Sequence, residues 1–412
     1  MIYLDHNATS PLLPEARAAW LEAEEKFPGN PSSPHRLGAR ADGALEQARQ
    51  RLSAILGCSP LDLVWTSGAT EACNTVLHHA AAAAEATGAS AAVSRAAPSV
   101  WVSAIEHPAV LETARYYFPG RVQTIPVDAH GVADLGWLKQ HLAHERAALV
   151  ALMAANNETG VLQPWREAHA LCAAAGVPFF CDATQWCGRL PARGLGACDF
   201  VAGSAHKFGG PRGVGFLKCP AGSPLRPFAP LLFGGKQQDG RRAGTENVAG
   251  ISAMLAALEW CERQLAAGDG GTGAEAARRA HRDRFARALQ TALPAAAVIG
   301  ANSRAGSDVP RLWNTVSVVM PDVADCRHRW VVKLDKAGFA VSTGSACASG
   351  SEHPSHVLTA MGLSAGEAAR ALRFSAGWLT PESAWDDLLA AIIRIQPGLA
   401  ATGGTAPANP GT

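Results

Sequence analysis

Short apolar runs that end in small or polar residues alternate with helical patterns through more than half of the chain. Six runs favour buried strands, at 63–68, 100–105, 148–156, 178–183, 199–204 and 213–219. Helical patterns lie between them, for example at 38–57, 70–87, 108–118 and 164–175. This alternation predicts an α/β fold in which helices flank a mostly parallel sheet.

Towards the C-terminus the pattern changes. A charged helical stretch is interrupted by "GDGGTG", which favours a loop, and the strand-like "TVSVVM" and "FAVSTGSAC" precede a last helical pattern at 381–395. We therefore predict a large domain over 15–258 and a smaller α+β domain made of 1–14 and 259–398. The Gly-, Pro- and Ala-rich end, 399–412, is typical of a disordered tail.

Composition narrows the class of protein. The chain has 412 residues, of which 48% are hydrophobic, so it can bury a sizeable core. Its 36 basic and 35 acidic side chains nearly cancel, which gives no sign of a nucleic-acid partner or an anionic membrane surface. No apolar run reaches the roughly 18 residues of a membrane span. The N-terminal "MIYLDHNATS" lacks a secretory signal, so we expect a cytoplasmic protein.

Ten cysteines are scattered along the chain, at 58, 73, 172, 181, 187, 198, 219, 261, 326 and 347. They form neither a C-x-x-C pair nor a cluster at zinc spacing, and we expect no metal site. The ordinary fate of such a residue is a small, buried, reduced side chain. We expect that fate for all but one of them.

Lys207 lies in "SAHKFGGPRGVG", between a histidine and a run of glycines. A phosphate-binding P-loop requires the lysine after the glycines, so the order argues against it. An exposed lysine before a turn is one alternative. The other is a buried amine that forms a Schiff base with a carbonyl, beside a backbone that glycine allows to approach a ligand. This segment alone leaves both open.

Other chemically active residues also follow predicted strands. They are Thr70, His107, Asn157 and Asp182, in addition to Lys207. Ligands of parallel α/β sheets bind at the carboxyl ends of the strands. We therefore expect these five side chains to share one site.

Ten segments resemble, in the same order, the cysteine desulfurases, which are pyridoxal-phosphate enzymes of the class-V, fold-type I aminotransferases. The segments are "YLDHNATSPL", "GNPSSPH", "TSGATEACN", "EHPAV", "NNETG", "DATQ", "SAHKFGGPRGVG", "RRAGTENV", "STGSACASG" and "RFSAG". Together they cover nearly the whole chain. The resemblance implies a large pyridoxal-phosphate-binding domain and a small domain that carries a catalytic cysteine.

The resemblance assigns three residues to the cofactor ring. Lys207 would bind pyridoxal 5'-phosphate as a Schiff base and later move the Cα proton of the substrate. Asp182 would keep the pyridine nitrogen protonated, although an aspartate here also suits a helix N-cap. His107 would stack on the ring and shuttle protons, the alternative being a structural histidine.

Further cofactor contacts follow in the same way. The free amides of Ala69 and Thr70 at a helix start would bind the phosphate. Ser204 and His206 would add donors to the phosphate. Gln185 would contact the phenolic oxygen of the ring. These five residues would complete the cofactor site around the lysine.

Asn157 would lie near the phenolic oxygen of the ring and the substrate carboxylate. Thr245 would reach the phosphate site of a neighbouring subunit, which implies a homodimer with shared active sites. Its alternative is a helix N-cap.

Substrate and sulfur chemistry would involve the small domain. Cys347 in "STGSACASG" is surrounded by small residues, and as a thiolate it would take the substrate sulfur as a persulfide. Arg373 would hold the substrate carboxylate with a bidentate fork. Asn7 and His35 would line the entrance, or serve as turn residues.

The resemblance implies conversion of L-cysteine to L-alanine, with delivery of sulfur to an acceptor such as an iron–sulfur scaffold or a thiolation enzyme. Alternatives are a selenocysteine or cysteine-conjugate β-lyase on the same fold, and a sulfur-transfer scaffold without catalysis. The chain departs from the family pattern at His6, Ser10, Lys236, Gln238 and 318–332. These departures concern partner choice and substrate entry rather than the core chemistry.

Overall fold

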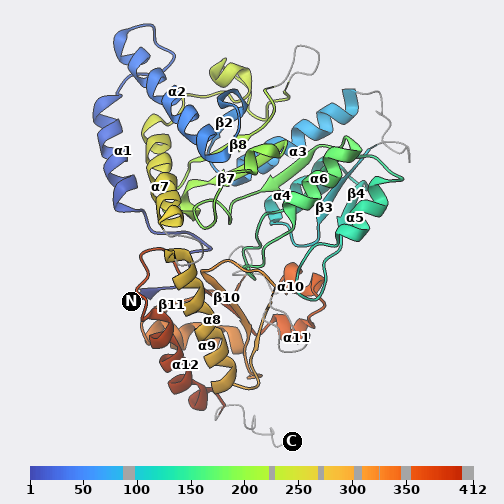
Figure 1. Cartoon of the computed structure of the whole chain (residues 1–412), viewed down its shortest axis with the longest axis vertical. Helices are drawn as coiled ribbons and strands as arrows, with labels where there is room; N and C mark the ends of the chain where they lie inside the picture. Colours follow the sequence, from blue (N-terminus) through green and yellow to red (C-terminus); the bar gives the residue numbers. More distant parts are fainter. Residues whose placement is uncertain are drawn as a thin grey trace, which may run out of the picture.

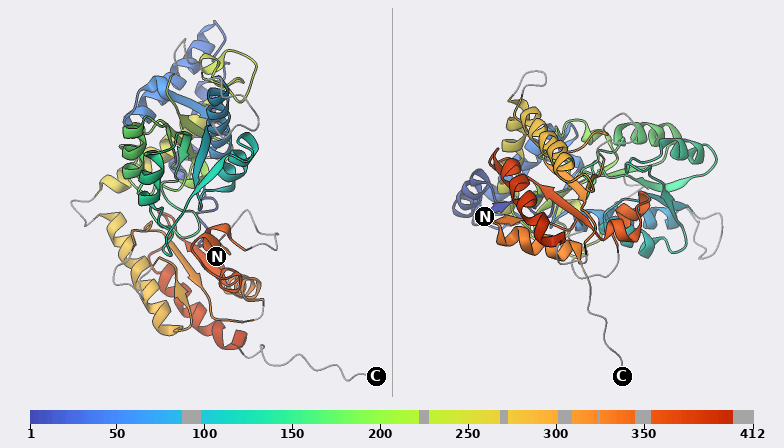
Figure 2. Two further views of the ribbon diagram at one scale, coloured as in Figure 1. Left: turned by 90° about the vertical axis from the view of Figure 1, so that its right-hand side faces the viewer. Right: turned by 90° about the horizontal axis from the view of Figure 1, so that it is seen from below.

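The structure is a computed structural model and describes seven ranges of the chain: 1–86, 98–221, 228–267, 273–300, 309–323, 325–344 and 354–400. These ranges form a large lobe and a small lobe that pack end to end (Figures 1 and 2). Among the helices of the described ranges, we find none with the length and apolar character needed to cross a lipid bilayer.

A seven-stranded sheet forms the centre of the large lobe, in the order β2-β8-β7-β6-β5-β3-β4. Its strands are β2 (Leu63–Thr66), β3 (Ser99–Ser103), β4 (Val122–Ile125), β5 (Ala147–Ala151), β6 (Phe179–Asp182), β7 (Phe200–Ser204) and β8 (Gly215–Lys218). Strands β7, β6, β5, β3 and β4 are parallel to one another, whereas β8 is antiparallel to both β2 and β7. The predicted α/β class with a mostly parallel sheet is confirmed.

Helices cover both faces of this sheet (Figure 1). They are α1 (Pro14–Lys26), α2 (Arg36–Leu56), α3 (Ala69–Ala86), α4 (Pro108–Tyr117), α5 (Leu135–Leu142), α6 (Trp165–Ala175) and α7 (Val248–Ala266). Successive strand residues point to opposite faces. Val100 and Val102 therefore pack in the cluster under α3 and α4, whereas Trp101 packs in the cluster under α2, α5, α6 and α7. Both faces are apolar because both are buried.

The small lobe is built on a three-stranded antiparallel sheet, β12-β10-β9. Its elements are α8 (Ala274–Ala292), β9 (Ala297–Val298), β10 (Thr315–Val319), α9 (Cys326–Lys336), β11 (Phe339–Ala340), α10 (His356–Ala360), α11 (Ala365–Ala368), β12 (Ala371–Ser375) and α12 (Ala384–Ala400). The first strand of the chain, β1 (Ile2–Tyr3), pairs in parallel with β11. Trp330, from the unusual segment 318–332, is buried in the core of this lobe.

The predicted domain boundaries stay a prediction. Helix α7 spans the proposed division at 258/259, and its buried face packs with α1 and α2 of the large lobe. The predicted tail, apart from its first two residues, lies outside the described residues.

Gln238 caps the edge of the large sheet. It lies in the short 3-10 helix η4 (Gln237–Gly240) with a left-handed φ of 53°. Its amide accepts from Trp65 N at 2.6 Å and donates to Trp65 O at 3.0 Å. Because β2 is an edge strand, this side chain supplies the hydrogen bonds that a further strand would make. Gln238, at which the chain departs from the family pattern, therefore has a structural role.

Candidate active site

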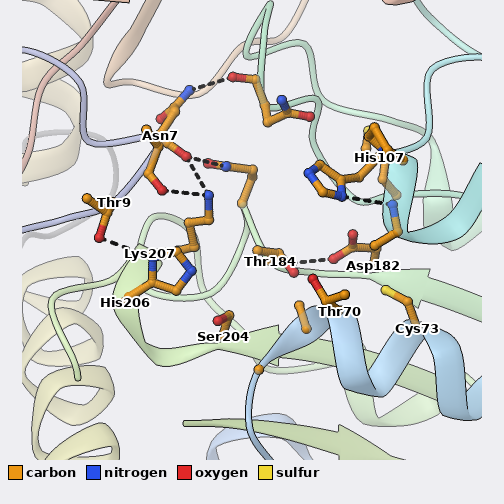
Figure 3. Close-up of a pocket in the computed structure, with 18 of the residues that line it drawn as sticks. Asn7, Thr9, Thr70, Cys73, His107, Asp182, Thr184, Ser204, His206 and Lys207 are labelled. Carbon is orange, nitrogen blue, oxygen red and sulfur yellow. Dashed lines mark hydrogen bonds between the residues drawn. The ribbon is translucent and has the colours of Figure 1, made fainter. Parts of the chain in front are cut away.

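The strand ends of the large sheet meet the small lobe at a cavity of about 720 Å³. Eleven of the thirteen predicted site residues line it: Asn7, Ala69, Thr70, His107, Asn157, Asp182, Gln185, Ser204, His206, Lys207 and Arg373. Figure 3 shows His107, Asp182, Ser204 and Lys207 around the same space. The carboxyl ends of the strands thus bring together residues that are far apart in the sequence.

Asp182 is the last residue of β6 and is 5% exposed. One of its carboxylate oxygens accepts from Thr184 N at 2.9 Å. Two neighbouring polar atoms, Thr184 Oγ1 and Gln185 Oε1, are buried and lack a hydrogen-bond partner among the described residues. Buried polar atoms without partners are costly, so these atoms indicate a polar ligand in the cavity.

Lys207 ends the short 3-10 helix η3 (Ala205–Lys207), which directly follows β7. Its Nζ donates to the carbonyl oxygens of Asn7 at 2.8 Å and Ala8 at 2.9 Å (Figure 3). The amine therefore lies inside the cavity and not on an outer surface. The alternative of an exposed lysine before a turn does not describe this geometry.

Asn7 is the hub of the hydrogen bonds at the junction of the two lobes. Its Nδ2 donates to Asn157 O at 3.1 Å and to Thr315 Oγ1 at 2.9 Å, and its Oδ1 accepts from Asn314 Nδ2 at 3.1 Å. Its carbonyl accepts from Gln185 Nε2 at 3.0 Å as well as from the lysine. The side chain is 1% exposed, so it positions neighbours within the cavity wall.

His107 lies between β3 and α4 and caps that helix. Its Nδ1 accepts from Ala109 N at 3.1 Å. Burial lowers the pKa of His107, and the positive charge of Lys207 adds to this, whereas the carboxylate of Asp182 raises it. The neutral ring therefore prevails, with its proton on Nε2 because Nδ1 is an acceptor.

The start of α3 forms an anion-binding end of the cavity. Ala69 and Thr70 are its first residues, and the first amides of a helix have no partner within it. Gly68, just before, adopts a φ of 154°, which favours glycine. Ser204 lies beside this helix start (Figure 3). Backbone donors and the helix dipole together suit a phosphate group.

Arg373, on β12, is a residue of the small lobe that lines the cavity. The side chain is 1% exposed, and its Nη2 donates to Asp5 Oδ1 at 2.6 Å. Its Nη1 donates to the carbonyls of Asn157 and Gly344 at 2.9 and 2.7 Å. The Nε atom is buried without a partner among the described residues. The predicted carboxylate fork is thus partly engaged by the protein itself.

Three of the residues singled out in the sequence are not among the cavity residues that the structure describes. Thr245 is exposed and is not among the residues that line the cavity. Cys347 lies outside the described residues. His35, named as a possible entrance residue, instead caps α2 by accepting from Gly38 N at 3.2 Å.

Sequence reasoning missed several residues of the cavity wall. They include Glu158, Thr184, Arg212, Ser355 and His356. Arg212 and Glu158 belong to segments that contain predicted site residues, Lys207 and Asn157, so their place in the cavity was predictable from these neighbours. Ser355 and His356 follow the cysteine segment in an ordinary turn sequence, "HPSH", which carries no such signal.

Pyridoxal 5'-phosphate fits the chemistry of these residues. A buried carboxylate suits a pyridinium, an enclosed amine suits an aldehyde, and the start of α3 suits a phosphate. The unpartnered oxygens of Thr184 and Gln185 are further groups for a polar ring to satisfy.

Comparisons with known proteins show the family of the chain. Residues 2–384 match the family described as aminotransferase class-V. The chain is 37% identical to a cysteine desulfurase of Klebsiella pneumoniae, with 96% of this chain and 92% of that protein covered. It is 38% identical to a cysteine desulfurase of Cereibacter sphaeroides, with 96% and 95% covered.

Two solved structures resemble this chain over most of its length. A NifS-like protein superposes with a TM-score of 0.80 at 30% identity, covering 97% of this chain and all of that one. A structure of SspA in complex with cysteine superposes with a TM-score of 0.72 at 25% identity, covering 91% and 98%. The chain belongs to the class-V aminotransferase family of enzymes. Within that family it belongs to the cysteine desulfurases, and the function expected from the motifs is confirmed.

Proposed function

We propose that this chain converts L-cysteine to L-alanine with bound pyridoxal 5'-phosphate and leaves the sulfur as a persulfide on Cys347. The observation that carries the proposal is the meeting of Lys207, Asp182 and His107 in one cavity, from three different strand ends. When bound, pyridoxal 5'-phosphate supplies an electron sink for the carbon atoms of an amino acid. The remaining chemistry belongs to side chains of the protein.

Lys207 would hold the cofactor covalently and then move the Cα proton of the substrate. The carbonyls of Asn7 and Ala8 give its amine a defined position while it is not bonded to the cofactor. Asp182 would hold a proton on the ring nitrogen, and His107 would pack on the ring. Thr70, Ser204 and His206, together with the Ala69 amide, would bind the phosphate.

Arg373 would bind the substrate carboxylate, with Asn157 beside it. The buried Nε atom of Arg373 is a donor that still lacks an acceptor among the described residues. A carboxylate oxygen at this atom would complete the coordination of the guanidinium. Asn7, which the sequence placed with the substrate, would act as a positioning residue because its side-chain amide is already occupied.

The described cysteines support Cys347 as the nucleophile by elimination. Eight of the nine have a raised pKa because burial disfavours the thiolate, including Cys58, Cys219 and Cys326, each at about 11. The ninth, Cys198, is fully buried and does not line the cavity. Cys73 lines the cavity but is fully buried, and its pKa is also raised well above the usual value. A thiol that stays protonated is a poor nucleophile.

The test is the reaction of the cofactor-loaded protein with L-cysteine. We expect one alanine for each sulfur released, and we expect Cys347→Ala to keep the visible absorbance of the bound cofactor while losing desulfuration. Cys73→Ala serves as the matched control and should stay active. Full turnover by Cys347→Ala would remove this residue from the mechanism, and elimination to pyruvate would favour a β-lyase.

A homodimer with shared sites is part of the proposal. Thr245 is exposed, and the preceding segment is held on α3 by an ion pair between Arg242 and Glu71, with a shortest N–O distance of 2.9 Å. Phe233, in a nearby loop, is 79% exposed. Aromatic side chains are enriched at interfaces between proteins, so Phe233 is a suitable contact for a second subunit.

Subunit mixing tests this arrangement. Lys207→Ala and Thr245→Ala chains would each assemble defective dimers. If Thr245 acts across the interface, mixed dimers contain one complete site and recover activity. Mixtures without any gain over the separate variants would place Thr245 outside the partner's site.

A protein acceptor for the persulfide also remains a proposal. An iron–sulfur scaffold and a thiolation enzyme both fit the chemistry. Labelling with sulfur-35 cysteine, followed by identification of the labelled protein, distinguishes them.

A further inference from the structure

A second and smaller cavity, of about 70 Å³, lies at the junction of the two lobes. The turn 184–189 of the large lobe contributes Arg189 to its lining, and the small lobe contributes Trp313 and Trp378. Lys207 borders this second cavity as well as the active-site cavity, and so does the N-terminal segment of the chain. The second cavity therefore lies behind the wall that positions the lysine.

Arg189 is a buried cation without an anionic partner. Its side chain is 3% exposed, and its Nη2 and Nη1 donate to the carbonyl oxygens of His6 at 3.2 Å and Gln185 at 3.4 Å. Among the described residues, no carboxylate pairs with it. A guanidinium has five N–H donors, so these two acceptors leave the others for a ligand. A buried charge that lacks a counter-charge is costly away from water.

The groups nearest to Arg189 do not neutralise its charge. Arg373 carries the same sign, and its own acceptor is Asp5. Cys187 and Cys261 are neutral thiols, because burial raises the pKa of both, that of Cys261 to about 12. Positive charge is therefore in excess on this side of the lobe junction.

The excess of positive charge also acts on nearby histidines. Burial lowers the pKa of His6 to about 3, and the charge of Arg189 adds to this effect. Burial likewise lowers the pKa of His206 to about 4, with contributions from the charges of Lys207, Arg212 and Arg189. A cavity with a positive potential attracts anions.

Two tryptophans of the small lobe hold the backbone of this turn. Trp313 Nε1 donates to the carbonyl of Arg189 at 2.8 Å, and Trp378 Nε1 donates to the carbonyl of Gly188 at 2.7 Å. The centroids of the two rings are 4.5 Å apart, and the guanidinium of Arg278 lies over both rings. Contacts with both lobes thus fix the position of Arg189, as a preorganised binding site requires.

The size and the opening of the second cavity limit the ligand. Its volume is far below the roughly 300 Å³ of a typical metabolite pocket, so only a small ligand fits. Leu12 and Leu379 line it and are 41% and 61% exposed, which makes the cavity accessible from solvent. A small anion can therefore reach Arg189 without passing through the active-site cavity.

We propose that the second cavity is an anion site, in which the guanidinium of Arg189 binds a small monovalent anion, chloride or a short carboxylate such as formate. The bound anion would balance a charge that the described residues leave uncompensated. It would also strengthen the contact between the two lobes, since both line the cavity. The proposal does not depend on the reaction that the active-site cavity performs.

Chloride-35 NMR tests binding directly, because exchange with a protein site broadens the chloride signal. Protein loaded with pyridoxal 5'-phosphate is used, so that the cofactor phosphate keeps chloride from the start of α3. We expect saturable broadening in wild type and the loss of most of it in Arg189→Gln. Arg115→Gln removes a charge from an exposed ion pair with Glu112 and serves as the control, which should match wild type. Equal broadening in all three proteins would overturn the proposal.

Variants at the exposed mouth of the cavity keep the test decisive if loss of Arg189 impairs folding. Leu379→Glu places a negative charge at the mouth, and we expect it to weaken chloride binding by about fivefold through repulsion. Leu379→Gln has a similar size without the charge and should bind chloride like wild type. Sodium gluconate, which is too large for the cavity, keeps the ionic strength constant. Equal affinities in the two variants would refute an anion at this place.

Urea denaturation measures the effect of the anion on stability. A ligand that binds only the folded protein stabilises it. We therefore expect replacement of gluconate by chloride to raise the urea midpoint of wild type and of Arg115→Gln, but not that of Arg189→Gln. A rise of the same size in Arg189→Gln would contradict the site.

Competition distinguishes the two kinds of anion. Sodium formate is added to wild-type protein in chloride. Formate that narrows the broadened chloride signal supports a site that also accepts short carboxylates. Formate without effect, together with broadening that depends on Arg189, supports a site for chloride alone.

Discussion

Nη2 of Arg373 lies 2.6 Å from Oδ1 of Asp5, so an ion pair joins the last strand of the chain to its first segment. Arg373 is nearly inaccessible, whereas the Asp5 side chain keeps 22% of its exposure. A buried guanidinium depends strongly on its acceptors, because charge without a partner is costly away from water. Asp5 therefore supports the residue expected to bind the substrate.

We predict that Asp5→Asn lowers the free energy of unfolding by about 2 kcal/mol, since it removes the charge from a buried charge-assisted hydrogen bond. The KM for L-cysteine should rise as well, because Arg373 loses its fixed orientation. Urea denaturation and steady-state kinetics measure the two effects. Asp386→Asn is the control. Asp386 forms an ion pair with Arg284 in which both side chains are exposed, so this substitution should change the free energy of unfolding by less than about 1 kcal/mol.

Replacement of Asn7 separates positioning from substrate binding. Asn7→Ala leaves the buried polar groups of Asn157, Thr315 and Asn314 without this partner. We expect a loss of about 3 kcal/mol of stability in the cofactor-free protein, from a few unsatisfied groups. A residue that only touched the substrate would show no such loss. Asn30→Ala, in an exposed turn, is the matched control.

We predict that the protein becomes less stable as the pH decreases, because of His6. Burial lowers the pKa of His6 to about 3, so the folded protein holds it neutral while the unfolded chain protonates it near its ordinary value. Stability is therefore unaffected above pH 6.5 and declines as pH falls from there towards 3, by about 1.4 kcal/mol per pH unit.

Denaturation of the cofactor-free protein at a series of pH values measures this slope. In His6→Asn, the difference in bound protons between the unfolded and the folded state should be smaller by close to one, and the slope should decrease accordingly. His206, whose pKa is lowered to about 4 by burial, leaves part of the slope in place. An unchanged slope in His6→Asn would show that His6 titrates alike in both states.

Gly377 and His6 should be strongly coupled. A Cβ at position 377 would come within 2.1 Å of the His6 ring, which is itself held near Ser10 and Thr380. We predict that Gly377→Ala destabilises the protein by about 3 kcal/mol through overpacking. The double variant with His6→Ala should recover most of this loss. Additive losses in the double variant would contradict the contact.

The strands of the large sheet were predictable because burial on both faces leaves continuous apolar runs. Strand β4 escaped prediction for the opposite reason. It is an edge strand, and only Ile125 of its four residues is buried. Helix α1 was missed because Ala16 and Ala23 are its only buried residues, which is too weak a stripe to detect.

The antiparallel direction of β8 was also predictable from the sequence. Residues 205–214 are too few for the crossover that a parallel neighbour of β7 requires, so β8 had to be antiparallel. The active-site residues at strand ends were predictable from the same logic of parallel sheets. Ser355 and His356 were not, because their place in the cavity depends on how the small lobe packs against Ile105 and Met153.

The opening residues of the chain have their partners near its other end. Ile2 pairs with Phe339, and Asp5 bridges to Ser375. On the ribosome, the N-terminal segment emerges hundreds of residues before those partners. We expect the nascent large lobe to fold first around its own sheet, with the carbonyls of Asn7 and Ala8 still unplaced. Lys207 then acquires its final surroundings only after Phe339 and Ser375 have left the ribosome, so the active site is completed later than the sheet that carries it.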